Sequence, residues 1–276
     1  MPAQHRSIRS LPRVAWALLP AIVVSACATA APDETPADAQ TAPPGATETT
    51  VAALPSPTIP DAAKPILDRL LKQYSTLSGV AVIARHRIQA PNRVLHESVR
   101  TLEFVKPNRF RVDADGTILV TCDGSRCWLF DRGKFGYNQV PAPTSMSDAM
   151  TAIHVLGSGS IAGSSGIIAA LLSADPHTAL LRNVDQISVF QAGNDAVLVL
   201  QIGGNQGTIH KGTRIGLFIP KTGPAWIAQA DIIPLNAQVH TRIVFEDWTP
   251  SEAPAEAFAL DPRALKLNTL DSTEQH

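Results

Sequence analysis

The sequence predicts an α+β fold in which a long antiparallel sheet is covered on one face by helices. Many strand-like segments follow one another through short turns, which is typical of an antiparallel meander. One helical segment precedes these strands and a second helical region interrupts them. A sheet of this length must curl and bury one face, and the central helices are the segments available to cover it.

Residues 1–26 have the parts of an export signal. A basic start without acidic residues precedes the apolar run Val14–Val24, which contains Pro20. This run is shorter than the roughly 20 residues of a membrane-spanning helix and suits a signal core of about 7–15 residues. The sequence therefore predicts removal of residues 1–26, with an uncleaved anchor helix as the alternative.

The signal ends in Val23-Val24-Ser25-Ala26-Cys27, which resembles the cleavage site of bacterial lipoproteins. The resemblance implies that Cys27 becomes the mature N-terminus and carries acyl chains such as palmitate, enough for stable anchoring. Ala28 stands where an aspartate would imply the inner membrane, so the expected location is the outer membrane, facing the periplasm. An ordinary secretory signal, cleaved after Ala26 or Ala28, is the alternative.

Residues 27–60 form the predicted tether between this anchor and the domain. From residue 28 to residue 60 the chain has seven prolines and no Lys, Arg or aromatic residue, a composition that cannot offset the entropy of ordering. The remainder is long enough for one domain, predicted at residues 61–267, with a flexible tail at 268–276. The formal net charge of −1 and the absence of a basic run argue against nucleic-acid binding.

The first half of the domain predicts a helix and then six strands. Residues 61–77 place apolar side chains at helical spacing, and residues 80–88 and 95–105 alternate as strands. Four short strands follow between residues 110 and 140. Asp115-Gly116 is a strong hairpin signal between two of them.

The second half predicts a helical insertion followed by further strands. Residues 145–156 suggest a helix, and a Gly/Ser stretch at 157–166 separates it from the apolar segment 167–172 as a mobile joint. A short helical turn is expected at 175–181. The expected strands then lie at 187–189, 197–202, 214–220, 226–233 and 242–248.

Taken in order, these patterns resemble the LolA/LolB superfamily of periplasmic lipoprotein carriers and, within it, an uncharacterised family of predicted periplasmic proteins. The resemblance rests on Val105–Val112, on Asp123-Gly124 ahead of Trp128-Leu129-Phe130, and on Val244–Trp248. It implies an incomplete antiparallel barrel whose concave face is covered by helices, with an apolar cavity that holds acyl chains.

Apolar side chains on the sheet and on the insertion are candidates to line such a cavity, although plain core packing is the alternative for each. The predicted ligand-binding residues are Phe104, Phe110, Trp128, Phe130, Ile167, Ile168, Leu171 and Leu172.

Cys122 and Cys127 form an even pair beside Cys27. A hairpin centred on Gly124-Ser125 would place them opposite each other, within reach of a disulfide. A turn centred on Asp123-Gly124 would instead place Cys122 opposite Ser125. A structural disulfide is the favoured state, a redox-active dithiol and two buried free thiols remain as alternatives, and the C-x4-C spacing differs from that of thioredoxin-like motifs.

The sequence contains no recognisable catalytic constellation. The Gly/Ser stretch lacks the lysine of a phosphate-binding loop, and no Gly-x-Ser-x-Gly occurs in it. His86 and His96 are expected to be solvated strand residues rather than metal ligands. We therefore expect no enzyme, metal or cofactor, but an anchored periplasmic lipoprotein that binds a lipid or a lipoprotein acyl chain. A protein-interaction or sensing module of the same fold, with an envelope protein as its partner, is the alternative.

Overall fold

The computed structural model describes residues 57–149, 152, 162–204, 211–235, 238–261 and 268–269. The chain divides into two compact units between Thr50 and Val51, and every described residue belongs to the second. The predicted signal, Cys27 and most of the tether lie outside the described residues, as do residues 270–276. No helix within the described ranges is both long enough and apolar enough to cross a membrane.

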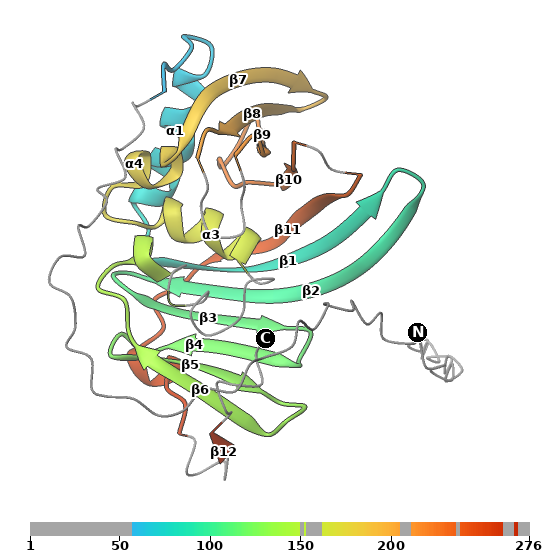
Figure 1. The fold of residues 1–276 in the computed structure, drawn as a ribbon. Helices are drawn as coiled ribbons and strands as arrows, with labels where there is room; N and C mark the ends of the chain where they lie inside the picture. The colour runs from blue at the N-terminus through green and yellow to red at the C-terminus, as the bar shows by residue number, and fades with distance from the viewer. Residues whose placement is uncertain are drawn as a thin grey trace, which may run out of the picture. The chain divides into compact units, whose positions relative to one another are not determined.

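The described part of the chain forms one twelve-stranded sheet (Figure 1). Its order is β12-β6-β5-β4-β3-β2-β1-β11-β10-β9-β8-β7. The strands are β1 (Gly79–Ala90), β2 (Arg93–Val105), β3 (Arg109–Ala114), β4 (Ile118–Cys122), β5 (Arg126–Asp131), β6 (Gly136–Pro141), β7 (Val184–Ala192), β8 (Asp195–Ile202), β9 (Arg214–Pro220), β10 (Gln229–Ile233), β11 (His240–Pro250) and β12 (Asn268–Thr269). All neighbours pair antiparallel except β12, which runs parallel to β6.

Strand alternation explains how the sheet divides its residues between two faces. Val80 and Val82 of β1 lie opposite Phe104 and Leu102 of β2, and all four side chains are buried. Because side chains alternate across a strand, the residues between them point to the other face. The predicted turn at Asp115-Gly116 joins β3 to β4, with positive φ at both residues.

Three helices with bounds inside the described ranges lie on the apolar face. They are α1 (Lys64–Ser75), α3 (Ala162–Leu171) and α4 (Pro176–Leu181), and their buried residues join those of the sheet in one hydrophobic core. α1 contacts β8 and α3 contacts β2, so the sheet curls around the helices (Figure 1). The predicted fold class, a strongly curved, incomplete antiparallel barrel with helices on its concave face, is confirmed.

Several boundaries differ from those expected. The predicted helix 145–156 begins with a 3-10 turn, η1 (Met146–Asp148), and most of its remainder lies outside the described residues. The last residues of the Gly/Ser stretch are helical, since α3 begins at Ala162. The predicted tail contains β12, which extends the sheet beyond β6.

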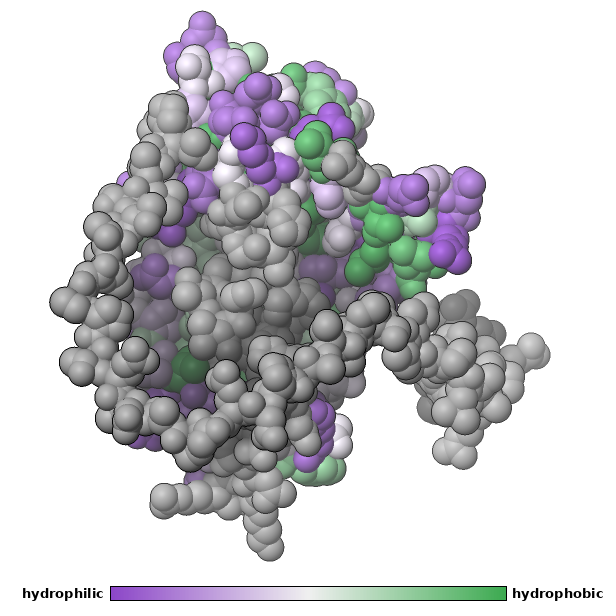
Figure 2. Space-filling model, viewed as in Figure 1, coloured by the Kyte–Doolittle hydropathy of each residue, from purple (hydrophilic) through white to green (hydrophobic). Residues whose placement is uncertain are grey.

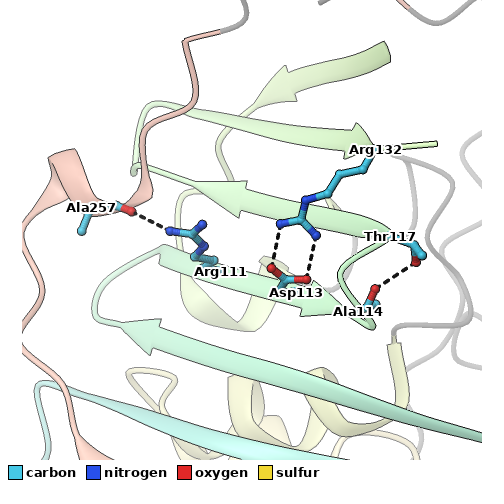
Figure 3. Close-up of polar contacts among 6 residues, drawn as sticks. All are labelled: Arg111, Asp113, Ala114, Thr117, Arg132 and Ala257. Carbon is cyan, nitrogen blue, oxygen red and sulfur yellow. Dashed lines mark hydrogen bonds and ion pairs between the residues drawn. The ribbon is translucent and has the colours of Figure 1, made fainter. Parts of the chain in front are cut away.

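The segment after β11 covers part of the outer face of the sheet. Phe258, in the 3-10 turn η3 (Ala255–Phe258), is fully buried, and its carbonyl accepts a hydrogen bond from the Thr121 hydroxyl at 2.6 Å. Arg111 donates to the Ala257 carbonyl on this same face (Figure 3). Nearby, Arg132 and Asp113 form a two-bond ion pair across the outer face, at 2.9 and 2.8 Å.

Candidate functional site

The candidate site lies between the inner face of the sheet and α3. Six of the eight predicted ligand-binding residues meet there: Phe104, Phe110, Ile167, Ile168, Leu171 and Leu172. The rings of Phe104 and Phe110 lie opposite each other on β2 and β3 and stack with centroids 5.8 Å apart. The inner face continues as an apolar surface through β8 and β9, where Leu198 lies opposite Leu217.

The structure does not bring Trp128 and Phe130 together with the other six residues. Their neighbours on β5, Cys127 and Leu129, face the helices, so Trp128 and Phe130 face the opposite side. Trp128 lies opposite Thr121, whose hydroxyl bonds to the segment that covers the outer face. β5 is apolar on both faces, and the sequence pattern therefore did not reveal which residues point inward.

α3 is an uncharged helix that is buried on nearly all sides. Its sequence, AGSSGIIAAL, carries small residues in the first half and larger apolar residues in the second. Such a helix is typical of a protein interior rather than of a surface cover. At Gly163 the helix approaches the sheet closely, because an added Cβ would lie 3.3 Å from the Ile232 side chain.

A group of buried polar side chains lies where α3 crosses β1 and β2. His86 Nε2 lies 2.8 Å from the Ser164 hydroxyl, and both residues are buried. On β2, Ser98 lies opposite His86, and Arg100 follows on the same face. Ser165 is fully buried in α3. We call these five residues the inner polar cluster.

Hydrogen-bonding capacity in the inner polar cluster is only partly used. The hydroxyls of Ser98 and Ser165, and Nε and Nη1 of Arg100, are buried and have no hydrogen-bond partner among the described residues. Buried polar groups in folded proteins almost always have a partner, because each unpaired group costs about 1–3 kcal/mol. The cluster is therefore unusual for a purely structural core.

Burial sets the charges in this cluster. It lowers the pKa of His86 to about 3, and the nearby Arg100 and His96 add to this effect. His86 is therefore neutral near pH 7. Burial also lowers the pKa of Arg100 to about 10, against the opposing effect of Asp115, so the guanidinium stays charged.

Sequence reasoning missed the inner polar cluster. His86 was expected to be solvated, but it is 5% exposed, and it lies opposite Ser98. The alternation of β2 could have indicated that this cluster is buried. Ser98 and Arg100 alternate in step with Leu102 and Phe104 and so lie on the same face of the strand. Polar residue types at these positions suggested solvent, whereas α3 covers them.

Cys122 and Cys127 lie directly opposite each other on β4 and β5, which confirms the register with a turn centred on Gly124-Ser125. Both are fully buried on the inner face, and both thiols are free, so the predicted disulfide is not formed in this structure. The side-chain hydrogen bond between Cys122 and Cys127, together with burial, raises the pKa of Cys127. No three His, Cys, Asp or Glu side chains in the described ranges gather as a metal site.

Comparisons with known proteins bear on the family. Residues 65–197 match the model of a family described as predicted periplasmic protein, DUF2092. No curated protein matches the chain significantly.

Solved structures with similar folds have low sequence identity. An uncharacterized conserved protein from Thermus thermophilus is 10% identical, with a TM-score of 0.45, over 76% of this chain and 99% of that one. A LolA superfamily protein from Nitrosomonas europaea is 11% identical, with a TM-score of 0.39, over 72% and 97%. A putative outer membrane lipoprotein-sorting protein domain from Vibrio parahaemolyticus is 8% identical, with a TM-score of 0.37, over 73% and 97%. Residues 65–197, from α1 into β8, correspond to the DUF2092 family of predicted periplasmic proteins, in agreement with the resemblance seen in the sequence.

Proposed function

We propose that this protein is a non-enzymatic periplasmic lipoprotein, anchored in the outer membrane, that binds an acyl chain of a lipid or lipoprotein. The ligand would lie between the inner face of the sheet and α3. The observation that carries this proposal is the extensive apolar surface of the inner face, interrupted only by the inner polar cluster among the described residues. This surface meets α3, an uncharged helix whose first half consists of small residues.

The mechanism is shielding of an apolar ligand from water. Burial of apolar surface stabilises a complex by roughly 25 cal/mol per Å². Residues 162–166 offer little apolar area to the sheet, and glycine and serine are weak helix formers. Separation of this half of α3 from β1 and β2 therefore costs less than separation of its second half, which contains Ile167 and Ile168.

Ligand binding is tested by native mass spectrometry of residues 28–276, exported with a non-lipoprotein signal and purified without detergent, followed by uptake of a fluorescent fatty acid. We expect a bound mass that matches a fatty acid or phospholipid. Phe104→Ala, on the inner face, should weaken uptake several-fold. Phe258→Ala removes a ring of equal size from the outer face and serves as the control. A clean apo mass together with no uptake would rule out the carrier function.

Anchoring is tested separately in cells of a Gram-negative host. Labelled palmitate should be incorporated into the wild-type chain and not into Cys27→Ser. Ala28→Asp should move the protein from the outer to the inner membrane fraction. Label in the Cys27→Ser variant would show that the lipid is elsewhere or that the signal is of another type.

A protein-interaction module is the second candidate, and exposed apolar strand ends favour it. Val94 and Leu95 of β2 and Phe190 of β7 are exposed, and β7 has β8 as its one neighbour in the described sheet. Figure 2 shows apolar surface at the free end of the β1–β2 hairpin. Strand edges and apolar patches of this kind are used in protein association. A photo-crosslinker at Phe190 would then give a discrete adduct in cells, and one at Phe135, which is even more exposed, would not.

A further inference from the structure

The inner polar cluster contains a buried cation without a buried counter-charge among the described residues. Arg100 is 8% exposed, and neither Nε nor Nη1 has a hydrogen-bond partner there. The carboxylate of Asp115 accepts a hydrogen bond from the Val99 amide at 2.6 Å. Among the described residues, Asp115 forms no ion pair with Arg100. An uncompensated charge in a protein interior is costly, and such groups are usually paired.

The strand neighbours of Arg100 offer its buried guanidinium no side chain with which to pair. Its partners across the strands are Ala84 on β1 and Ala114 on β3, and its Nε and Nη1 are shielded from solvent. The unpaired hydroxyls of Ser98 and Ser165 provide two further donors in the same cluster. His86 already bonds to Ser164 and adds no charge.

Apolar walls continue from this cluster in more than one direction. Leu102 and Phe104 follow Arg100 on the same face of β2, and Ile167 and Ile168 follow Ser165 on α3. A polar group at one end of an apolar surface fits an amphiphile, with its head at the cluster and its chain along the wall.

We propose that Arg100, Ser98 and Ser165 bind the carboxylate of a long-chain fatty acid whose chain lies between β2 and α3. The inference rests on the proposed function and names the head group of its ligand. A guanidinium presents paired N–H donors that match the two oxygens of a carboxylate. A single positive charge also matches a monoanion, whereas the dianion of a phosphate monoester would leave excess negative charge buried.

The test compares three amphiphiles with the same sixteen-carbon chain: palmitic acid, hexadecanol and hexadecyl phosphate. Each displaces a fluorescent fatty acid from the purified protein. Wild-type protein should bind the acid at least about tenfold more tightly than the alcohol, as expected for one charge-assisted pair. Arg100→Gln should remove this preference and leave the affinity for the alcohol within about twofold. Arg87→Gln, the same change at an exposed arginine on β1, should keep the preference.

The outcomes separate the inference from the proposed function. If neither acid nor alcohol binds the wild-type protein, the proposed function fails. If both bind equally, the apolar site stands and the carboxylate site is overturned. Tighter binding of hexadecyl phosphate than of palmitic acid would overturn the choice of head group.

A second variant keeps the test decisive if Arg100→Gln does not fold, which circular dichroism would show. Ser165→Ala removes one hydroxyl from the cluster and keeps the charge. It should weaken binding of the acid by about threefold or more, since one hydrogen bond is lost, and leave binding of the alcohol unchanged. Equal affinity for the acid in this variant and in the wild type would count against the site.

Discussion

His86 illustrates how burial turns an ordinary strand residue into a source of pH sensitivity. Its folded pKa of about 3 lies far below the value of 6.5 that it has when exposed. Between these two values the unfolded chain binds a proton that the folded chain does not. Acidification through this window therefore favours the unfolded state, by up to about 1.4 kcal/mol per pH unit.

We expect the free energy of unfolding of the wild-type protein to fall more steeply between pH 6.5 and pH 5 than that of His86→Gln. Glutamine keeps a partner for the Ser164 hydroxyl but does not titrate. Urea unfolding at several pH values measures both slopes. His177→Gln, at an exposed position on α4, is the control and should retain the wild-type slope. Parallel slopes for wild type and His86→Gln would show that His86 stays exposed enough to bind its proton.

Residues on the inner face also show how far strand alternation can predict which side chains are buried. Alternation places Val80 with Val82, and Leu102 with Phe104, on one face of their own strands, and the structure buries all four on the inner face. Trp128, Leu129 and Phe130 are consecutive apolar residues, so alternation said nothing about which of them points inward. Arg100 pointed inward by parity, but a charged side chain normally indicates solvent, and only the position of α3 shows otherwise.

At the scale of elements, the β4–β5 hairpin holds two thiols in a geometry that suits oxidation. Asp123 donates its amide to the Arg126 carbonyl, so Cys122 and Cys127 occupy the adjacent, non-hydrogen-bonded pair. Cα atoms in such a pair lie roughly 4.5 Å apart, within the range that a disulfide spans.

We expect the two thiols to be oxidised in protein isolated from the periplasm, because that compartment favours disulfides. Alkylation without reductant, followed by mass spectrometry, should then label neither cysteine, and both should be labelled after reduction. Loss of the bond should cost less than about 3 kcal/mol, since the loop is short. Full labelling without reductant would establish free thiols in the cell as well.

α3 is the element that the sequence predicted least well. Gly163 and its serine neighbours suggested a joint, yet they form the first half of a helix, since the inner face of the sheet stabilises a segment with weak intrinsic propensity. The apolar residues 167–172 were correctly placed against the sheet. The local sequence of α3 cannot predict its tertiary contacts, such as the hydrogen bond between Ser164 and His86.

Gly163→Ala tests whether the first half of α3 controls ligand entry. The change should stabilise the helix by about 0.5–1 kcal/mol and slow the exchange of a bound fluorescent fatty acid. The nearest contact of the new Cβ is the end of the flexible Ile232 side chain, which can move. Ala170→Gly weakens the same helix and should have the opposite effect on the exchange rate. Equal rates in both variants would exclude α3 as the moving part.

At the scale of the folded unit, the segment after β11 acts as a strap across the outer face. Phe258 is buried against this face, and the Arg109 guanidinium lies 5.9 Å from the centre of its ring. The sequence does not show what Phe258 covers. The segment around Phe258 is irregular, so it has no hydrophobic periodicity from which burial could be predicted. The partners of Phe258 on β3 and β4 lie more than a hundred residues earlier in the chain.

Phe258→Ala should lower the free energy of unfolding by about 3 kcal/mol, as for other buried aromatic side chains. Hydrogen exchange should become faster in β3 and β4, which this segment contacts. Phe135→Ala, at an exposed ring, is the control and should change neither quantity. An unchanged exchange rate in β3 and β4 would show that the segment after β11 does not stabilise them.

The pairing of β1 with β11 has a consequence for how the chain must fold. Val80 pairs with Pro250, and His86 with Ile243, so the first strand of the sheet is completed by one of the last. Until β11 has been synthesised and exported, β1 presents an unpaired edge of twelve residues. Closure of so long a loop is slow, and an open edge invites pairing with other chains. The edge of β1 that β11 will cover therefore stays open to such pairing until the C-terminal strands arrive.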